Sequence, residues 1–435
     1  MKEEVNFFWI RRDLRLTDNA GLYHALKDNQ KVIPVFIFDR NILDKLEGKK
    51  DARVQFLHQE LLKIKEELRA FGSDLLVEHG FPEEVWTKLL EEHAIKSVYT
   101  NEDYEPYARE RDGKIRKLLE NKGCAFHSYK DHVIFEKDEI VKDNGDPYVV
   151  YTPYSKKWLA SFTRGMTESF PTEEYFDSFY RFQVDSFPSL EIMGFEPCQV
   201  NFPSRDIDVS VVDHYGERRD TPSIKGTSRI SMHLRFGTVS IRKVTAIAQQ
   251  RSSSWLNELI WRNFYQMIIW FFPESATNNF REAYDAVKWR NNEDEFQAWC
   301  EGRTGYPIVD AGMRELNKTG FMHNRVRMIT ASFLAKHLLV DWRWGEAYFA
   351  SKLLDFELAS NVGGWQWASG SGCDAAPYFR VFNPELQTKK FDPELKYIRK
   401  WVPEYGTTSY PRPIVEHKIA RERALSTYKK ALKRD

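Results

Sequence analysis

Short apolar runs alternate with amphipathic stretches over the first 130 residues of the chain. The apolar runs predict buried strands at residues 5–10, 32–38, 74–78, 97–100 and 125–129. Between them, apolar positions recur with helical spacing at residues 20–28, 52–71, 82–93 and 107–122. Such alternation predicts an α/β domain built on a doubly wound parallel sheet.

The pattern changes twice further along the chain. Residues 131–200 have little periodicity and are rich in Pro, Asp, Ser and aromatic residues, and Pro147 and Pro153 indicate turns or extended chain. Because so long an irregular stretch is uncommon inside a compact protein, we expect a connector between two domains. From residue 201 to 435 the spacing is almost entirely helical, which predicts an all-α second domain.

Composition excludes several classes of protein. The four cysteines lack the C-x-x-C or C-x-x-H spacing of a zinc site, so we expect no metal. Lys2, Glu3 and Glu4 stand where a secretory signal would begin its apolar stretch, and no apolar run is long enough to span a membrane. We therefore expect a cytoplasmic monomer with no membrane partner.

Charge is balanced overall but unevenly distributed. The chain has 64 basic and 64 acidic residues, yet residues 131–200 hold 6 basic against 13 acidic, and residues 301–435 hold 22 against 15. A basic C-terminal third favours a polyanionic partner, although chance also produces an excess of this size. Aromatic residues make up 14% of the chain, which suits either the binding of planar groups or a large helical core.

The segment 355–384 is unlike an ordinary amphipathic helix, because Trp365 and Trp367 stand among Gly, Ser, Ala and Asn. Gly363 and Gly364 remove side-chain bulk just before an indole, as the close approach of a flat ligand requires. Taken alone, the segment also suits a tight turn between core helices. Its sequence, N-x-G-G-W-Q-W and then D-A-A-P-Y-F-R-x-F-N-P, resembles the flavin-binding segment of the DNA photolyase/cryptochrome family.

The resemblance extends over nearly the whole chain. After the first predicted strand, W-I-R-R-D-L-R-L-x-D-N resembles the signature of the family's antenna domain, and no G-x-G-x-x-G indicates ordinary dinucleotide binding. The resemblance implies a Rossmann-like antenna domain at 1–130, a connector at 131–200 and a helical FAD-binding catalytic domain at 201–435. Tyr107 and Ala108 replace the Asn-Glu pair that contacts folate in the best-known folate-binding members, and the sequence Glu-Pro-Tyr is closer to members that use a deazaflavin or a second flavin. The antenna chromophore stays open among methenyltetrahydrofolate, deazaflavin and FMN.

The resemblance also implies FAD as cofactor. The residues that would bind it are Tyr215, Thr227, Ser228, Arg229, Ile230, Ser231, Trp255, Arg262, Asp355, Phe356, Glu357 and Asn361. From the residues alone, Thr227 and Ser228 are expected to cap the helix after the polar loop 220–231, where free amides favour an anion. Glu357 and Val362 depart from the Asp and Asn that are usual in the family.

A second group of residues is expected to bind the substrate. Trp255, Glu258, Arg262 and Tyr265 are spaced to share one helical face, on which Glu258 and Arg262 suit a surface ion pair. Shielded by apolar neighbours, Glu258 is also a candidate partner for a flat polar substrate. The resemblance implies catalytic roles for Glu258, Asn324, Met328 and Asn361. It implies DNA or lesion contacts for Arg219, Glu258, Trp261, Asn324, Arg325, Trp367 and Arg380.

His323 is expected to be a hydrogen-bonded core histidine. The sequence M-H-N-R around it is similar to the subgroup that repairs cyclobutane pyrimidine dimers, whereas members that repair (6-4) lesions have His-His there. By resemblance alone, Trp289, Trp342 and Trp365 form an electron-transfer chain to the flavin.

The family resemblance is strongest to class I cyclobutane-dimer photolyases. It implies a light-dependent carbon–carbon lyase that flips a dimer out of UV-damaged double-stranded DNA and splits it with an electron from excited reduced FAD. A cryptochrome-type blue-light sensor and a flavin-containing DNA-binding protein without repair are the two alternatives. The presence of Glu258, Asn324 and Met328 argues against the sensor.

Overall fold

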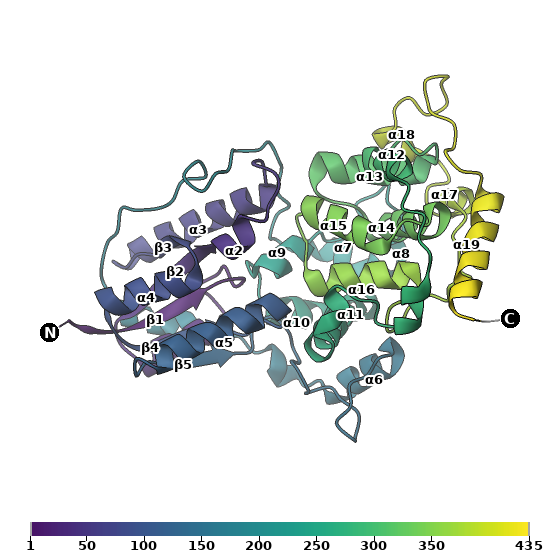
Figure 1. Ribbon diagram of the computed structural model, residues 1–435. Coiled ribbons are helices and arrows are strands. Elements are labelled where there is room, and N and C mark those ends of the chain that lie inside the picture. The colour runs from purple at the N-terminus through teal and green to yellow at the C-terminus, as the bar shows by residue number, and fades with distance from the viewer. Residues whose placement is uncertain (1, 434–435) are drawn as a thin grey trace. The chain divides into compact units, whose positions relative to one another are not determined.

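A computed structural model describes residues 2–433, which form two compact units (Figure 1). The first unit contains the chain up to residue 139 together with residues 161–206 and 230–250. The second contains residues 140–160, 207–229 and the chain from residue 251 onward. The domain boundaries drawn from the sequence, at 130 and 200, stay a prediction.

The first unit is built on a five-stranded parallel sheet with strand order β3-β2-β1-β4-β5. The strands are β1 (Glu4–Ile10), β2 (Val32–Asp39), β3 (Leu76–Gly80), β4 (Ala94–Asn101) and β5 (Ala125–Tyr129). The four long helices between them are α1 (Ala20–Asp28), α3 (Ala52–Ala70), α4 (Pro82–Glu92) and α5 (Pro106–Glu120). The predicted doubly wound parallel sheet is confirmed.

Side-chain alternation along β1 explains why helices cover both faces of this sheet. Phe8 and Ile10 pack with α1 and α3, whereas Phe7 and Trp9 pack with α4 and α5. All four side chains are buried, so the strand reads as a continuous apolar run, as is typical of parallel sheets.

The first unit also contains short elements that the sequence pattern did not reveal. These are α2 (Arg40–Leu43) and the 3₁₀ turns η1 (Arg164–Thr167) and η2 (Thr172–Ser178). It further contains α9 (Ser231–Phe236) and α10 (Ile241–Arg251), which lie in the stretch predicted to be helical. The prediction that Thr227 or Ser228 caps the helix after loop 220–231 is wrong. Arg229 adopts a left-handed conformation with φ of 54°, so α9 begins only after Ile230, whose side chain makes no capping hydrogen bond.

The second unit is helical. Its helices are α6 (Tyr151–Ser161), α7 (Val209–Asp213), α8 (Tyr215–Arg218), α11 (Ser253–Phe271), α12 (Glu293–Glu301), α13 (Pro307–Thr319), α14 (Asn324–Ser332), α15 (Trp342–Lys352), α16 (Leu358–Ser369), α17 (Pro384–Phe391), α18 (Lys396–Trp401) and α19 (His417–Ala431). Three shorter elements join them: the 3₁₀ turns η3 (Pro273–Ala276) and η4 (Glu282–Ala286) and the π-helix η5 (Phe333–Leu338). The predicted all-α second domain is confirmed. Within residues 2–433, no helix has the length and apolar character to cross a membrane.

α16 is the central helix of the glycine- and tryptophan-rich segment. It buries Val362, Trp365 and Gln366, so it is a helix without an exposed polar face rather than an amphipathic one. Its glycines allow close packing: a Cβ on Gly363 would lie 2.3 Å from the ring of Tyr265 on α11. Gly345 of α15 is likewise covered by the indole of Trp365, 2.1 Å from where its Cβ would be.

Candidate active site

α11 presents Glu258 and Arg262 to different partners. Glu258 forms an ion pair with Arg219, which follows α8, and each side chain is about one third exposed. Arg262 pairs instead with Glu357 at 2.8 Å, so the Glu258–Arg262 surface pair that the spacing suggests does not form. Burial raises the pKa of Glu258 and outweighs the attraction of the Arg219 guanidinium.

α14 brings further predicted residues to the same region of the second unit. Arg325 donates to Asp220 at 2.8 Å, and Asp220 directly follows Arg219 in the chain. The adjacent pair Arg219 and Asp220 therefore ties α11 to α14 and brings Glu258 and Arg325 together. Asn324 is exposed at the start of α14, and Met328 is half-buried with its sulfur 3.7 Å from Arg325 Nη1.

His323 is a core histidine as expected, but only one of its ring nitrogens is paired, since Nε2 has no hydrogen-bond partner among the described residues. Its side chain is buried, and its Nδ1 accepts a hydrogen bond from the backbone N–H of Arg325 at 3.1 Å, which caps α14. Burial lowers the pKa of His323 to about 4, so the imidazole is neutral at pH 7.

The carboxylates at the start of α16 are held by arginines of two other helices. Asp355 accepts from Arg327 of α14 at 2.9 Å, and Glu357 accepts from Arg262 of α11. Asn361 donates to the Glu346 carboxylate of α15 at 2.8 Å, and burial raises the pKa of Glu346. Arg327 and Glu346 were not predicted, because each lies on a separate helix and no motif marks it.

The remaining predicted FAD residues are divided between the two units. Trp255 is buried on α11, Phe356 packs against the core of the second unit, and Tyr215 is half-buried on α8. Thr227, Ser228 and Arg229 also belong to the second unit, where the Arg229 guanidinium lies 4.2 Å from the ring centre of Phe321. Ile230 and Ser231 belong to the first unit.

Several features of the second unit suit a flat cofactor with polar edges. The Trp365 indole N–H is buried and has no hydrogen-bond partner among the described residues. A Cβ on Gly364 would meet nothing within 4 Å, so one side of α16 offers backbone without covering side chains. Arg262 and Asn361 supply cationic and amide donors nearby on α11 and α16. Val362 points into the buried core, where the Asn usual in the family is replaced by an apolar side chain.

The three tryptophans predicted to carry electrons differ in how completely they are buried. Trp365 and Trp342 are buried in one core, and the Trp342 indole N–H donates to Asn279 at 2.8 Å. Trp289 is half-buried and meets the ring of Tyr428 edge-on at 6.1 Å. Trp299, which was not predicted, lies 6.0 Å from Trp365 and is completely buried.

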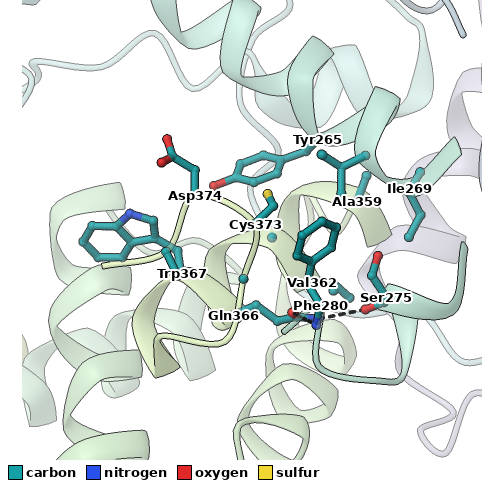
Figure 2. A pocket seen from close by; sticks show the side chains of 14 residues that line it. Tyr265, Ile269, Ser275, Phe280, Ala359, Val362, Gln366, Trp367, Cys373 and Asp374 are labelled. Atoms are coloured by element: carbon teal, nitrogen blue, oxygen red, sulfur yellow. Dashed lines mark hydrogen bonds between the residues drawn. The ribbon is translucent and has the colours of Figure 1, made fainter. Parts of the chain in front are cut away.

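The two tryptophans predicted to face the lesion are both half-buried. Trp261 of α11 stacks on Tyr151 of α6, and Trp367 of α16 has the exposed Arg380 guanidinium 5.8 Å from its ring centre. Trp367 also lines a mainly apolar pocket between α11, η3, α16 and residues 372–375 (Figure 2). Glu258, Trp261 and Asn324 are not among the residues that line this pocket. Of the residues predicted to bind the lesion, Trp367 alone is among those that line it.

Comparison with known proteins assigns the chain to a family. Residues 6–174 match the family model described as DNA photolyase, and residues 255–408 match that of the FAD binding domain of DNA photolyase. A deoxyribodipyrimidine photo-lyase from Synechococcus sp. is 36% identical, over 97% of this chain and 96% of that protein. The chain belongs to the DNA photolyase family. The match to the FAD-binding model confirms FAD as its cofactor.

Solved photolyase structures are similar over the full length of the chain. A class III photolyase from Agrobacterium tumefaciens has a TM-score of 0.89 and 33% identity, and the match covers 100% of this chain and 98% of that one. An archaeal photolyase from Sulfolobus tokodaii, described with two FAD molecules, has a TM-score of 0.83 and 35% identity, covering 98% and 100%. These likenesses confirm the photolyase fold, and the class I assignment stays a prediction.

Proposed function

We propose that this photolyase splits cyclobutane pyrimidine dimers in UV-damaged double-stranded DNA with the energy of light. The observation that carries the proposal is the cluster on α8, α11 and α14, where Glu258 and Arg325 are linked through the adjacent Arg219 and Asp220. A partly shielded carboxylate beside a half-buried indole suits a substrate that is flat and polar at its edge.

FAD would be held mainly by side chains of the second unit. The proposed set is Tyr215, Thr227, Ser228, Arg229, Ile230, Ser231, Trp255, Arg262, Asp355, Phe356, Glu357 and Asn361. When bound and reduced, the flavin supplies the light-driven electron that opens the cyclobutane ring and that returns afterwards. The protein residues orient the ring and exclude water, since Trp255 and Glu357 are both buried.

The lesion would be bound outside the duplex, at an unpairing cost of a few kcal/mol that damage lowers. Trp261 and Trp367 offer flat apolar surfaces to the two pyrimidines, while Glu258 and Asn324 meet their polar edges. Met328 and Asn361 complete the proposed catalytic group. Arg219, Arg325 and Arg380 would contact phosphates or the lesion. Arg219 and Arg325 are already paired with carboxylates, so binding DNA exchanges one anionic partner for another.

Trp365, Trp342 and Trp289 would carry electrons between the protein surface and the flavin; the first two are buried and Trp289 is half-buried. The antenna chromophore stays open among the three candidates. A monomeric state and a cytoplasmic location also stay predictions.

UV-irradiated plasmid provides the test of this function. We expect the purified, FAD-loaded protein to remove the sites cut by a dimer-specific endonuclease under blue light, and to leave them in the dark. Equal numbers of sites in light and dark would contradict repair and favour a sensor or a DNA-binding protein.

A further inference from the structure

The first residue of α6 forms the closest ring stack on Trp261. The ring centroids of Tyr151 and Trp261 are 3.5 Å apart and the planes differ by 4°. The other rings around Trp261 are farther away and inclined to it: Phe264 at 5.8 Å and 82°, and Tyr265 at 5.6 Å and 34°. Tyr151 is only 7% exposed, whereas Trp261 is half-buried. Tyr151 therefore covers one face of the indole, and the exposed area of Trp261 lies on the rest of the ring.

Hydrogen bonds at both ends hold Tyr151 in place. Its hydroxyl donates to Asn257 Oδ1 at 2.6 Å, and Asn257 immediately precedes Glu258 on α11. Its backbone N–H donates to Asp374 at 3.1 Å, in the loop that follows Trp367 and α16. Tyr151 is thus tied to α11, which presents Trp261, and to the loop that follows the helix of Trp367.

The rest of α6 strengthens this attachment. Two turns after Tyr151, the buried Trp158 donates its indole N–H to Asn263 of α11 at 3.0 Å. α6 therefore lies against α11 along its length and cannot shift without breaking contacts at both ends.

We propose that Tyr151 is a positioning residue for lesion binding, which holds the Trp261 indole so that its open face meets a flipped-out pyrimidine dimer. The inference rests on the proposed function, because it requires Trp261 to face the dimer. A half-buried indole has several staggered rotamers, and a parallel stack restricts it to one. Ordering the indole before the lesion arrives lowers the entropic cost of binding.

Binding of a duplex with one thymine dimer by the FAD-loaded protein tests the proposal. Tyr151→Leu should weaken that binding about tenfold, the size expected for one aromatic stack, and leave affinity for the undamaged duplex and the FAD content unchanged. Tyr151→Phe keeps the ring and should stay within about threefold of wild type. If Tyr151→Leu does not fold, Tyr151→Met has a flexible side chain that adapts to the gap without a flat face, and it should show the same loss.

A matched control separates positioning from general packing. Tyr306 is also buried in the second unit, with its hydroxyl bonded to the Val415 carbonyl at 2.8 Å, and it lies outside the proposed site. Tyr306→Leu should leave dimer affinity unchanged. A loss in Tyr306→Leu equal to that in Tyr151→Leu would overturn the proposal, because any buried tyrosine would then matter equally.

A double-mutant cycle shows whether Tyr151 acts through Trp261. Trp261→Leu alone should weaken dimer binding, and adding Tyr151→Leu should weaken it no further. Additive losses would overturn the proposal. Suppose that the wild type binds dimer-containing duplex more tightly than undamaged duplex and that Trp261→Leu loses this preference. If Tyr151→Leu then keeps the preference, this inference alone fails. If wild type shows no preference for dimers, the proposed function and this inference fail together.

Discussion

Glu258 experiences two opposing influences on its charge. Burial raises the pKa of its carboxyl group, while the ion pair with Arg219 favours the carboxylate. A DNA phosphate that draws Arg219 away would remove the second influence and leave a carboxyl that is more readily protonated. The protonation of Glu258 therefore depends on whether Arg219 pairs with Glu258 or with a DNA phosphate when the lesion is bound.

We expect Glu258→Gln to keep FAD and DNA binding but to lower the number of dimers repaired per absorbed photon by at least about twofold, because a charged partner for the lesion is lost. Wild-type yield should also fall as the pH is lowered through the raised pKa of Glu258, whereas the variant should lack that acid limb. Repair yields measured from pH 5 to 8 check both points. Full yield in Glu258→Gln at neutral pH would make Glu258 only an ion-pair partner.

His323 provides a prediction about stability. Its pKa is about 4 in the folded protein and about 6.5 in an unfolded chain, so the unfolded state takes up the proton first as the pH falls. Between pH 7.5 and 5.5 this lowers the free energy of unfolding by about 1.3 kcal/mol.

His323→Asn keeps a residue that caps helices and should reduce the pH dependence of urea unfolding by that amount. His214→Asn replaces an exposed histidine and should leave the pH dependence of urea unfolding as in wild type. An unchanged pH dependence in His323→Asn would contradict the buried, neutral histidine.

At the scale of elements, hydrophobic periodicity predicted β1 to β5 and the long helices of the first unit within a few residues, because both faces of the sheet are buried. It missed α6, because Pro153 indicates a turn or extended chain when the sequence is considered alone. Pro153 is the third residue of α6, where a helix needs no backbone N–H, so proline is compatible with the start of a helix.

Motifs similarly located the residues of the candidate site but not their partners. The pairs Glu258–Arg219, Glu357–Arg262 and Asn361–Glu346 each join parts of the chain that are far apart in sequence or on separate elements, and such contacts leave no periodic signal in the sequence. Tyr151 was missed for a different reason, because it lies in the stretch expected to be a connector.

Trp365 of α16 and Trp342 of α15 lead to a prediction about electron transfer. In wild type with oxidised flavin and an external reductant, blue light should reduce the flavin. Trp365→Phe and Trp342→Phe should slow this reduction at least about tenfold, because phenylalanine is much harder to oxidise than tryptophan. Repair that starts from chemically reduced flavin should be nearly unchanged in both.

Trp299→Phe is the matched control for this prediction. Trp299 contacts Trp365 and is completely buried, but it is not one of the three tryptophans predicted to carry electrons, so its replacement should leave photoreduction as in wild type. Stable, FAD-loaded Trp365→Phe that photoreduces at the wild-type rate would leave Trp365 as a core residue, whose replacement costs only stability.

At the scale of the whole molecule, charge is balanced but basic groups are in excess over residues 301–435. Binding to DNA should therefore weaken as salt rises, since arginines and lysines release counterions from phosphates. Arg325 differs from other basic residues because it is also packed against Phe391, 4.4 Å from the ring centre, and linked through Asp220 to the Glu258 region.

We expect Arg325→Ala to weaken binding to dimer-containing DNA by about 1–2 kcal/mol and to undamaged duplex by less. Arg303→Ala removes an exposed arginine of the same unit, paired with Glu301, and should leave the ratio of the two affinities unchanged. Titrations of both DNAs at one salt concentration check this. Equal losses of affinity for the two DNAs would mean that Arg325 contacts only the DNA backbone.

Light-driven splitting of the dimer is tested most directly by the number of dimers split per photon in an oligonucleotide with a single thymine dimer. The protein is first loaded with FAD and chemically reduced, so that neither photoreduction nor the antenna influences the result. We predict that blue light restores the two thymines in wild type, that darkness does not, and that Glu258→Gln does so with lower yield. Reduced, FAD-loaded protein that binds the dimer and leaves it intact under blue light would contradict the account.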